Sequence, residues 1–187
     1  MSTRGAGSLL SWINDLRTAR PAPLNGYGGR AAVIDPAQLA AACGHLYKHH
    51  DLYTVTAVSP KRFLIVVPAD CSDCFLSKAK ISTDTGELGL YLSEAPTVTA
   101  NGTPVTMRNA NRNYPDDLSI DVYVDPTITD DGTQLEHHTI FGGNKEENSG
   151  FVGEDFWTLK SGTLYEFRMA TTTTVRACVQ ISIAENG

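Results

Sequence analysis

The sequence has no apolar run long enough to cross a bilayer, because the longest apolar block, residues 63–68, is only strand-sized. Residues 1–7 are small and polar, so the chain begins without the apolar segment of a signal peptide. Basic residues are also few: 15 Lys and Arg stand against 21 Asp and Glu, for a net charge of −6. They are scattered along the chain. We therefore expect no membrane and no nucleic acid among its partners.

Cysteine is scarce, with only Cys43, Cys71, Cys74 and Cys178. Because no secretion signal precedes them, we expect free thiols. Cys71 and Cys74 form a CxxC, but a structural zinc site needs two further ligands at suitable spacing, and the sequence has no second CxxC. The flanking sequence is also unlike the βαβ setting of a redox CxxC. The sequence thus predicts a turn with two semi-buried thiols, and neither metal nor cofactor.

Catalytic motifs are missing too, since there is no GxSxG and no P-loop. The adjacent carboxylates at 130–131 and 154–155 are typical of turns. The adjacent histidines would point to opposite faces of a strand. On a helix His45 and His49 are four apart and could share a metal, but no carboxylate on that turn completes the site. A cupin-like enzyme would need several histidines and a carboxylate together. We expect no catalytic residue and a non-enzymatic protein. The histidines are His45, His49, His50, His137 and His138.

What the chain does contain is alternation of apolar and polar residues. Apolar side chains recur at every second position in 120–124, 165–169 and 175–183. This period of two is typical of strands with one face on a core. No helical pattern interrupts residues 86–183, so the sequence predicts a mainly β protein. We expect an antiparallel β-sandwich, jelly-roll-like, rather than a parallel sheet.

Further strands and turns fit this interpretation. Residues 52–58 and 88–92 alternate, and 63–67 is apolar throughout, as in a strand buried on both faces. Asn101-Gly102 is a strong hairpin signal, and Gly162 marks a second one between strands at 156–159 and 164–169.

The N-terminal part is predicted to be an appendage. Residues 1–34 are expected to be an extended arm with a short helix after Ser8 and a Pro- and Gly-rich linker at 20–29. The arm could wrap its own domain or reach another chain. Asp35-Pro36 is typical of a helix start, so residues 35–187 are predicted to be the β-sandwich domain with a leading helix at about 36–49.

The order of several motifs resembles a known family. An N-x-N-R segment (Asn109 to Arg112), Gly-Thr at 132–133, a glycine-rich loop at 142–150 and a W-x-L-K-x-x-T-x-Y stretch (Trp157 to Tyr165) follow one another. Over about residues 50–185 the chain resembles tailed-bacteriophage virion structural proteins. The resemblance implies a β-sandwich of the capsid decoration, or cement, type without catalytic residues.

The resemblance also implies a role. A decoration protein, made in the host cytoplasm and located on the capsid surface of the virion, would bind the major capsid protein and self-associate, with a trimer preferred. We expect contacts from the 1–30 arm and the loops at 108–113 and 142–150. An alternative is a tail fibre, spike or collar component that binds a receptor or glycan through exposed aromatics; Trp157 is expected in the core instead. The aromatic candidates are Tyr91, Tyr114, Tyr123 and Trp157.

Overall fold

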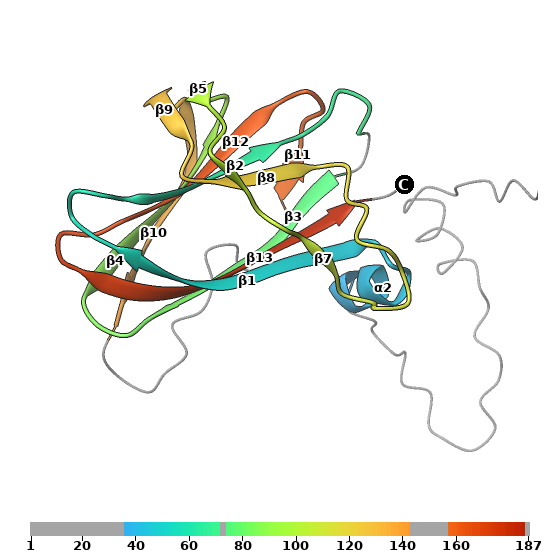
Figure 1. Cartoon of the computed structure of the whole chain (residues 1–187), viewed down its shortest axis with the longest axis horizontal. Coiled ribbons are helices and arrows are strands. Elements are labelled where there is room, and N and C mark those ends of the chain that lie inside the picture. Colours follow the sequence, from blue (N-terminus) through green and yellow to red (C-terminus); the bar gives the residue numbers. More distant parts are fainter. Residues whose placement is uncertain (1–35, 72–73, 143–156, 186–187) are drawn as a thin grey trace, which may run out of the picture.

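The computed structural model describes residues 36–71, 74–142 and 157–185 and is mainly antiparallel β (Figure 1). The predicted arm at 1–34 and most of the loop at 142–150 lie outside these residues. The five-stranded sheet has the order β11-β3-β13-β1-β7, formed by Trp157–Leu159, Cys74–Thr83, Val175–Glu185, Leu46–Val55 and Arg108–Asn109. The six-stranded sheet has the order β10-β4-β12-β2-β8-β6, formed by Thr133–Phe141, Glu87–Glu94, Leu164–Ala170, Lys61–Val66, Asp121–Val124 and Thr103–Pro104.

The pairing of the strands is that of a jelly roll. The first four strands pair with the last four in reverse order: β1 with β13, β2 with β12, β3 with β11 and β4 with β10. The β13–β3 and β12–β4 pairs then join these ladders into two sheets. Eight strands wound in this way over two sheets define the jelly roll, so the predicted fold class is confirmed.

An insertion between β4 and β10, residues 95–132, extends one side of the sandwich. Within it β7 adds to the edge of β1, and β8 followed by β6 adds beyond β2. The remaining strands, β5 (Thr97–Ala100) and β9 (Thr127–Asp130), form a separate two-stranded ribbon. The insertion pairs strand edges that would otherwise invite association with other chains.

The core lies between the sheets and contains the apolar residues predicted from alternation. On β12, Tyr165, Phe167 and Met169 are buried, and the intervening Arg168 is half-buried on the outer face. The Phe63 ring lies 6.0 Å from that of Phe167. At about 25 cal/mol per Å² of apolar surface removed from water, such side chains supply most of the favourable energy of folding. The five β13 residues predicted to face the core are also buried: Val175, Ala177, Val179, Ile181 and Ile183.

The leading helix is shorter than predicted. Helix α2 covers Pro36–Ala42, and β1 already begins at Leu46, so the expected helix to about 49 and the expected strand at 52–58 are wrong in their bounds. Gly44 has φ +78°, a left-handed conformation that ends a helix. Beyond it, β1 pairs with β13 over ten positions, and this long ladder outweighs the local helical pattern. Among the described residues, no helix is long and apolar enough to cross a membrane.

Both predicted hairpins are also wrong, although their turns exist. Gly102 and Gly162 have φ +91° and +66°, as turn glycines do. However, β5 pairs with β9 while β6 pairs with β8. Likewise β11 belongs to the five-stranded sheet and β12 to the six-stranded one. Each turn therefore carries the chain from one sheet to another.

Candidate functional surfaces

The N-x-N-R segment is built around one buried amide. Asn109, only 1% exposed, donates from Nδ2 to the carbonyl oxygens of Gly44 (2.8 Å) and Pro115 (3.2 Å). Its Oδ1 accepts from the backbone N–H of Asn111 (2.9 Å), whose own Nδ2 donates to the carbonyl of Ala42 (3.0 Å). The two asparagines therefore hold the segment against the end of α2 and satisfy carbonyl groups there that lack a helical partner.

A carboxylate fixes the other side of this segment. Asp116 accepts from the Asn109 backbone N–H at 2.6 Å, from Arg108 at 2.8 Å and from Arg112 at 2.6 Å. The hydrogen bonds from Arg108 and Arg112, followed by that from the Asn109 backbone, hold the pKa of Asp116 well below its ordinary value. The carboxylate thus stays charged and keeps both guanidinium groups in place.

The outcome is an exposed ridge, which we define as Arg108, Arg112 and Tyr114. The side chains of the two arginines are 66% and 64% exposed, and Tyr114 is 46% exposed. The Tyr114 ring lies over Gly44, where a Cβ would be only 2.4 Å from its Cγ. A fixed set of two cations and an aromatic ring is the composition favoured at protein interfaces, where Arg and Tyr are enriched.

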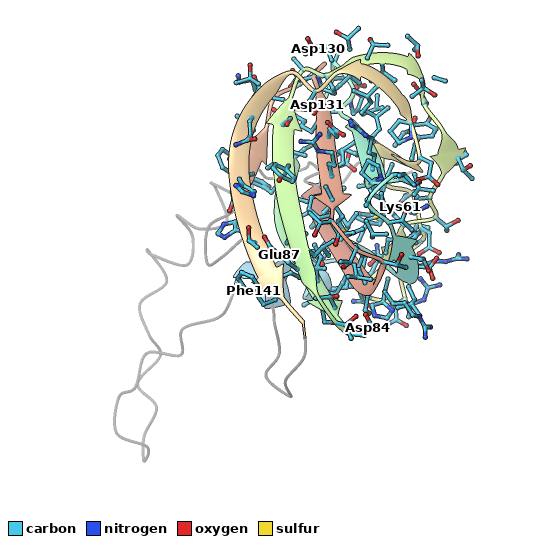
Figure 2. The ribbon with its side chains drawn as sticks, turned by 90° about the vertical axis from the view of Figure 1, so that its left-hand side faces the viewer. Lys61, Asp84, Glu87, Asp130, Asp131 and Phe141 are labelled. Atoms are coloured by element: carbon cyan, nitrogen blue, oxygen red, sulfur yellow. A yellow bond between two sulfur atoms is a disulfide. The ribbon has the colours of Figure 1, made fainter. Side chains whose placement is uncertain are left out.

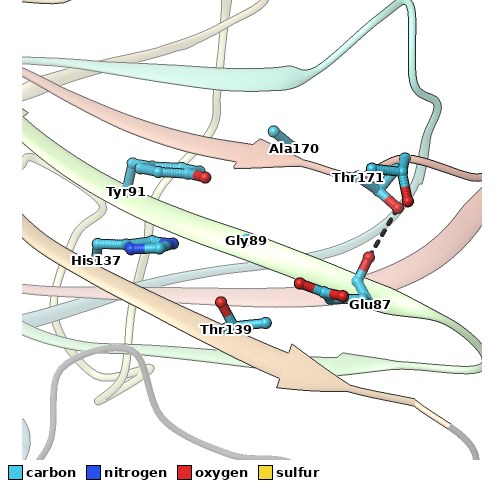
Figure 3. Close-up of a pocket in the computed structure, with 8 residues that line it drawn as sticks. Glu87, Gly89, Tyr91, His137, Thr139, Ala170 and Thr171 are labelled. Atoms are coloured by element: carbon cyan, nitrogen blue, oxygen red, sulfur yellow. Dashed lines mark hydrogen bonds between the residues drawn. The ribbon is translucent and has the colours of Figure 1, made fainter.

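A second surface feature is a groove on the outer face of the six-stranded sheet. It has a volume of about 240 Å³ and crosses β10, β4 and the end of β12 (Figure 3). Gly89 and Ala170 offer little side chain on its floor, whereas its rim carries carboxylate, hydroxyl, phenol and imidazole groups. These rim groups belong to Glu87, Tyr91, His137, Thr139 and Thr171.

One wall of this groove is a stack of side chains. The rings of Tyr91 and His137 are 4.4 Å apart and nearly parallel, at 8°, as Figure 3 shows. The guanidinium carbon of Arg168 is 4.5 Å from the centre of the Tyr91 ring. Because β10 and β12 flank β4 on opposite sides, these partners cover both faces of the ring. Tyr91 therefore has no free face for a sugar, and only its edge and hydroxyl remain.

The stack continues into a network of charges. Asp131 accepts from Arg168 (2.6 Å) and from Arg62 (2.8 Å), and Arg62 also donates to Glu166 (2.5 Å). Figure 2 shows Asp131 at the end of this sheet remote from Glu87. Burial raises the pKa of Glu166, although the charge of Arg62 opposes this shift. The network orders the outer face of the sheet.

The pattern of the turn carboxylates is partly as predicted. Asp130 accepts from the Gly132 backbone N–H at 2.8 Å, which is a turn-capping role. Asp131 instead bridges two arginines across the sheet, although its side chain is still 39% exposed. The pair at 154–155 lies outside the described residues.

The histidines are dispersed over the fold. His49 and His50 lie on β1, where they project to opposite faces, and a helical 45/49 pair does not exist because α2 ends earlier. His49 contacts the Tyr53 hydroxyl at 2.9 Å, and His50 Nε2 lies 3.0 Å from Cys178 Sγ. On β10, His138 contacts Glu136 at 2.7 Å.

The remaining aromatic candidates also have intramolecular partners. Trp157 is half-buried against the core, as expected, and its Nε1 donates to Glu136 Oε2 at 2.7 Å. The Tyr123 hydroxyl donates to Asp121 at 3.3 Å. Of the four aromatic residues considered for glycan binding, Tyr114 is thus the most exposed.

The expectation of two thiols at the CxxC is wrong. Cys71 and Cys74 are joined by a disulfide, and both are buried, whereas Cys43 and Cys178 are free. The fold also brings the carboxylate of Glu185 to them, so that the two sulfurs and one carboxylate oxygen lie within 4.8 Å of one another. Sequence reasoning missed this third donor because it is 111 residues further along the chain, and only the β3–β13 register places it opposite Cys74.

Comparison of the chain with protein-family models, with curated proteins and with solved structures finds no match.

Proposed function

We propose that this protein is a non-enzymatic virion structural component, a decoration protein that binds the outer surface of a bacteriophage head. In this role it bridges neighbouring major-capsid subunits and stabilises the shell. It acts by burying surface against its neighbours, and it self-associates as a trimer.

The observation that carries the proposal is the exposed ridge. The two asparagines of the N-x-N-R segment, which belongs to the phage resemblance, make internal hydrogen bonds. Arg112 of this segment, with Arg108 and Tyr114 on either side of it, stays exposed at the surface. A preorganised surface loses little entropy on binding. The jelly-roll architecture supports the same role, since it is a recurrent fold of viral capsid domains.

The charge distribution and symmetry fit this role. The chain is acidic overall, with a net charge of −6, but the ridge presents two guanidinium groups against the single carboxylate of Asp116. This local excess of positive charge favours an acidic patch on the partner. On a symmetric shell each protein repeats the same contacts, and modest affinity per ridge is multiplied through multivalency within a trimer.

The test uses purified particles that lack the protein. We expect the full-length chain to bind them, and the double variant Arg108→Gln and Arg112→Gln to bind at least about tenfold more weakly, as loss of interface arginines commonly causes. The control, Lys160→Gln with Arg176→Gln, removes two other exposed positive charges and should bind like the wild type. Equal binding by both double variants would refute the ridge as the contact surface.

A second candidate function is favoured by the groove on the six-stranded sheet. Its hydroxyl, carboxylate and imidazole groups can each exchange hydrogen bonds with a saccharide. A tail fibre, spike or collar component that binds a glycan would use such a site. The volume of about 240 Å³ is below the usual range of small-molecule sites, about 300–1,000 Å³. The exposed ridge therefore supports the decoration role more strongly than the groove supports glycan binding.

Glycan-array binding by the isolated protein separates the two functions. If the groove binds sugars, Thr139→Val should abolish the signal, because it removes a hydroxyl from the rim while keeping the shape of the side chain. Thr54→Val, at an exposed position on β1 in the other sheet, is the matched control. Binding lost only in Thr139→Val, together with a location in the tail, would replace our proposal.

A further inference from the structure

The end of the sandwich near β3 brings together three atoms that metal ions bind. Cys74 opens β3 and lies directly opposite Glu185 on β13, and Cys71 lies three positions before Cys74 in the β2–β3 connection. The two sulfurs and a Glu185 oxygen lie within 4.8 Å of one another. Ligands of a tetrahedral zinc are about 3.3–3.8 Å apart, given bonds of about 2.0–2.3 Å. The carboxylate oxygen is therefore near the required distance, and the two sulfurs, which are bonded to each other here, would have to move apart after reduction.

The surroundings of these atoms are those of a supported site. Glu185 accepts from the backbone N–H of Ser119 at 2.8 Å and from the Ser119 hydroxyl, which fixes its carboxylate. The Ser161 hydroxyl donates to the carbonyl of Cys71. Cys71 and Cys74 are 6% and 0% exposed. Metal ligands are commonly held by such hydrogen bonds from neighbouring groups. Here the two sulfurs are buried and Glu185 is half-buried, which leaves room for a water ligand.

The disulfide that occupies the site in this structure closes a very small loop. Its cysteines are three positions apart, so the bond restricts the unfolded chain much less than a long-range disulfide would. The disulfide therefore contributes little to the stability of the folded protein. The same CxxC spacing is the one that places two thiolates on a single zinc ion.

We propose that Cys71, Cys74 and Glu185 form a zinc site that fills when this disulfide is reduced. Two molecules of a thiol reductant reduce the disulfide, giving two cysteine thiols and one molecule of oxidised, disulfide-linked reductant. Zinc then displaces the two thiol protons and binds both thiolates and the carboxylate, with water in the fourth position. The site is independent of the ridge, and it revises the expectation, based on sequence, that the CxxC binds no metal.

Zinc stoichiometry tests the proposal directly. Full-length protein is reduced with a phosphine, incubated with zinc, desalted and analysed by atomic emission. We expect one zinc ion per reduced chain and none per oxidised chain. Cys71→Ser and Cys74→Ser should lose zinc, and Glu185→Gln should weaken binding at least about tenfold. The control, Cys43→Ser with Cys178→Ser, removes two other cysteines and should retain one zinc ion.

A second measurement needs no variant, in case the cysteine variants fold poorly. Reduced wild-type protein is alkylated with and without zinc, and the labelled cysteines are identified by mass spectrometry. Zinc should protect Cys71 and Cys74 while labelling of Cys43 and Cys178 stays the same. Equal labelling of Cys71 and Cys74 in both samples, or reduced and folded protein that retains no zinc, would overturn the proposal.

Discussion

At the scale of single residues, Asn109 links three parts of the chain through one buried side chain. Its amide donates to carbonyls at Gly44 and Pro115 and accepts from the backbone of Asn111. Removing it leaves buried polar groups without partners, and each such group costs about 1–3 kcal/mol. The amide therefore matters more than its size suggests.

We predict that Asn109→Ala lowers the free energy of unfolding by about 2–4 kcal/mol, measured by urea denaturation. Asn113→Ala is the matched control, because Asn113 is an exposed asparagine in the same segment. It should change stability by no more than about 0.5 kcal/mol. Similar small losses in both variants would show that the amide network is not what holds the segment.

Two acidic residues in the charge network should make stability depend on pH in opposite directions. Burial raises the pKa of Glu166, so the folded state holds its proton more tightly than the unfolded state. Its contribution to stability therefore declines as pH rises above the ordinary value of 4.5. Burial also acts to raise the pKa of Asp131, but the hydrogen bond from Arg62 and the charges of Arg168 and Arg62 outweigh it and lower the pKa.

We predict that Glu166→Gln gains stability relative to the wild type as pH rises from about 4 to 7, because it removes a carboxylate that the fold prefers protonated. Asp131→Asn should show the reverse. The stabilisation by ionised Asp131 is present above its ordinary pKa of 3.8 and is lost as pH falls below it. Urea denaturation between about pH 2.5 and 7 measures both. If the free energy of unfolding of both variants changed with pH in the same way as that of the wild type, this account of the network would be contradicted.

At the scale of elements, the junction between α2 and β1 depends on Gly44. Its φ of +78° costs another residue about 1 kcal/mol, and a Cβ there would overlap the ring of Tyr114. Gly162 has a similar φ of +66° but open space, since the nearest atoms to a Cβ are 3.8 Å away.

We predict that Gly44→Ala destabilises the protein by at least about 1 kcal/mol more than Gly162→Ala, because only the first also overpacks. In a Tyr114→Ala background this excess should disappear, which a double-mutant cycle measured by denaturation would show. An excess that persists without the ring would mean that Tyr114 is not the cause.

The elements that could be predicted from the sequence are those whose signal lies in residues close together in the chain. Strands such as β12 and β13 were predictable, because alternation records which side chains meet the core. The end of α2 and both hairpin partners were not, because local patterns do not say which distant strand will compete for a segment. Asn101-Gly102 does make a turn, but the flanking strands find better partners in β9 and β8.

At the scale of the whole molecule, the candidate sites arise from the winding of the jelly roll. The sequence singled out residues 108–113 as a candidate contact segment, and the structure shows Arg108 and Arg112 exposed there, while their contacts with a partner stay a prediction. The groove, the charge network and the meeting of Cys71 and Cys74 with Glu185 were not predictable, because each depends on register between strands far apart in sequence. No local motif records such a register.

The N-terminal arm gives a prediction for the assembly. We expect a chain without residues 1–30 to lose particle binding, because the arm is expected to supply contacts. The sandwich should stay folded, because the eight paired strands of the jelly roll lie within residues 46–185. Circular dichroism would show whether the shortened chain is folded, and co-sedimentation with particles would measure its binding. Undiminished occupancy by the shortened chain would exclude the arm as a contact.

The copy number of the protein in purified particles, measured by quantitative mass spectrometry against the major capsid protein, tests the central proposal most directly. A decoration protein repeats with the shell, so we predict on the order of hundreds of copies per particle, in a fixed ratio to capsid subunits. About a dozen copies or fewer would contradict the account and place the protein in the tail or collar.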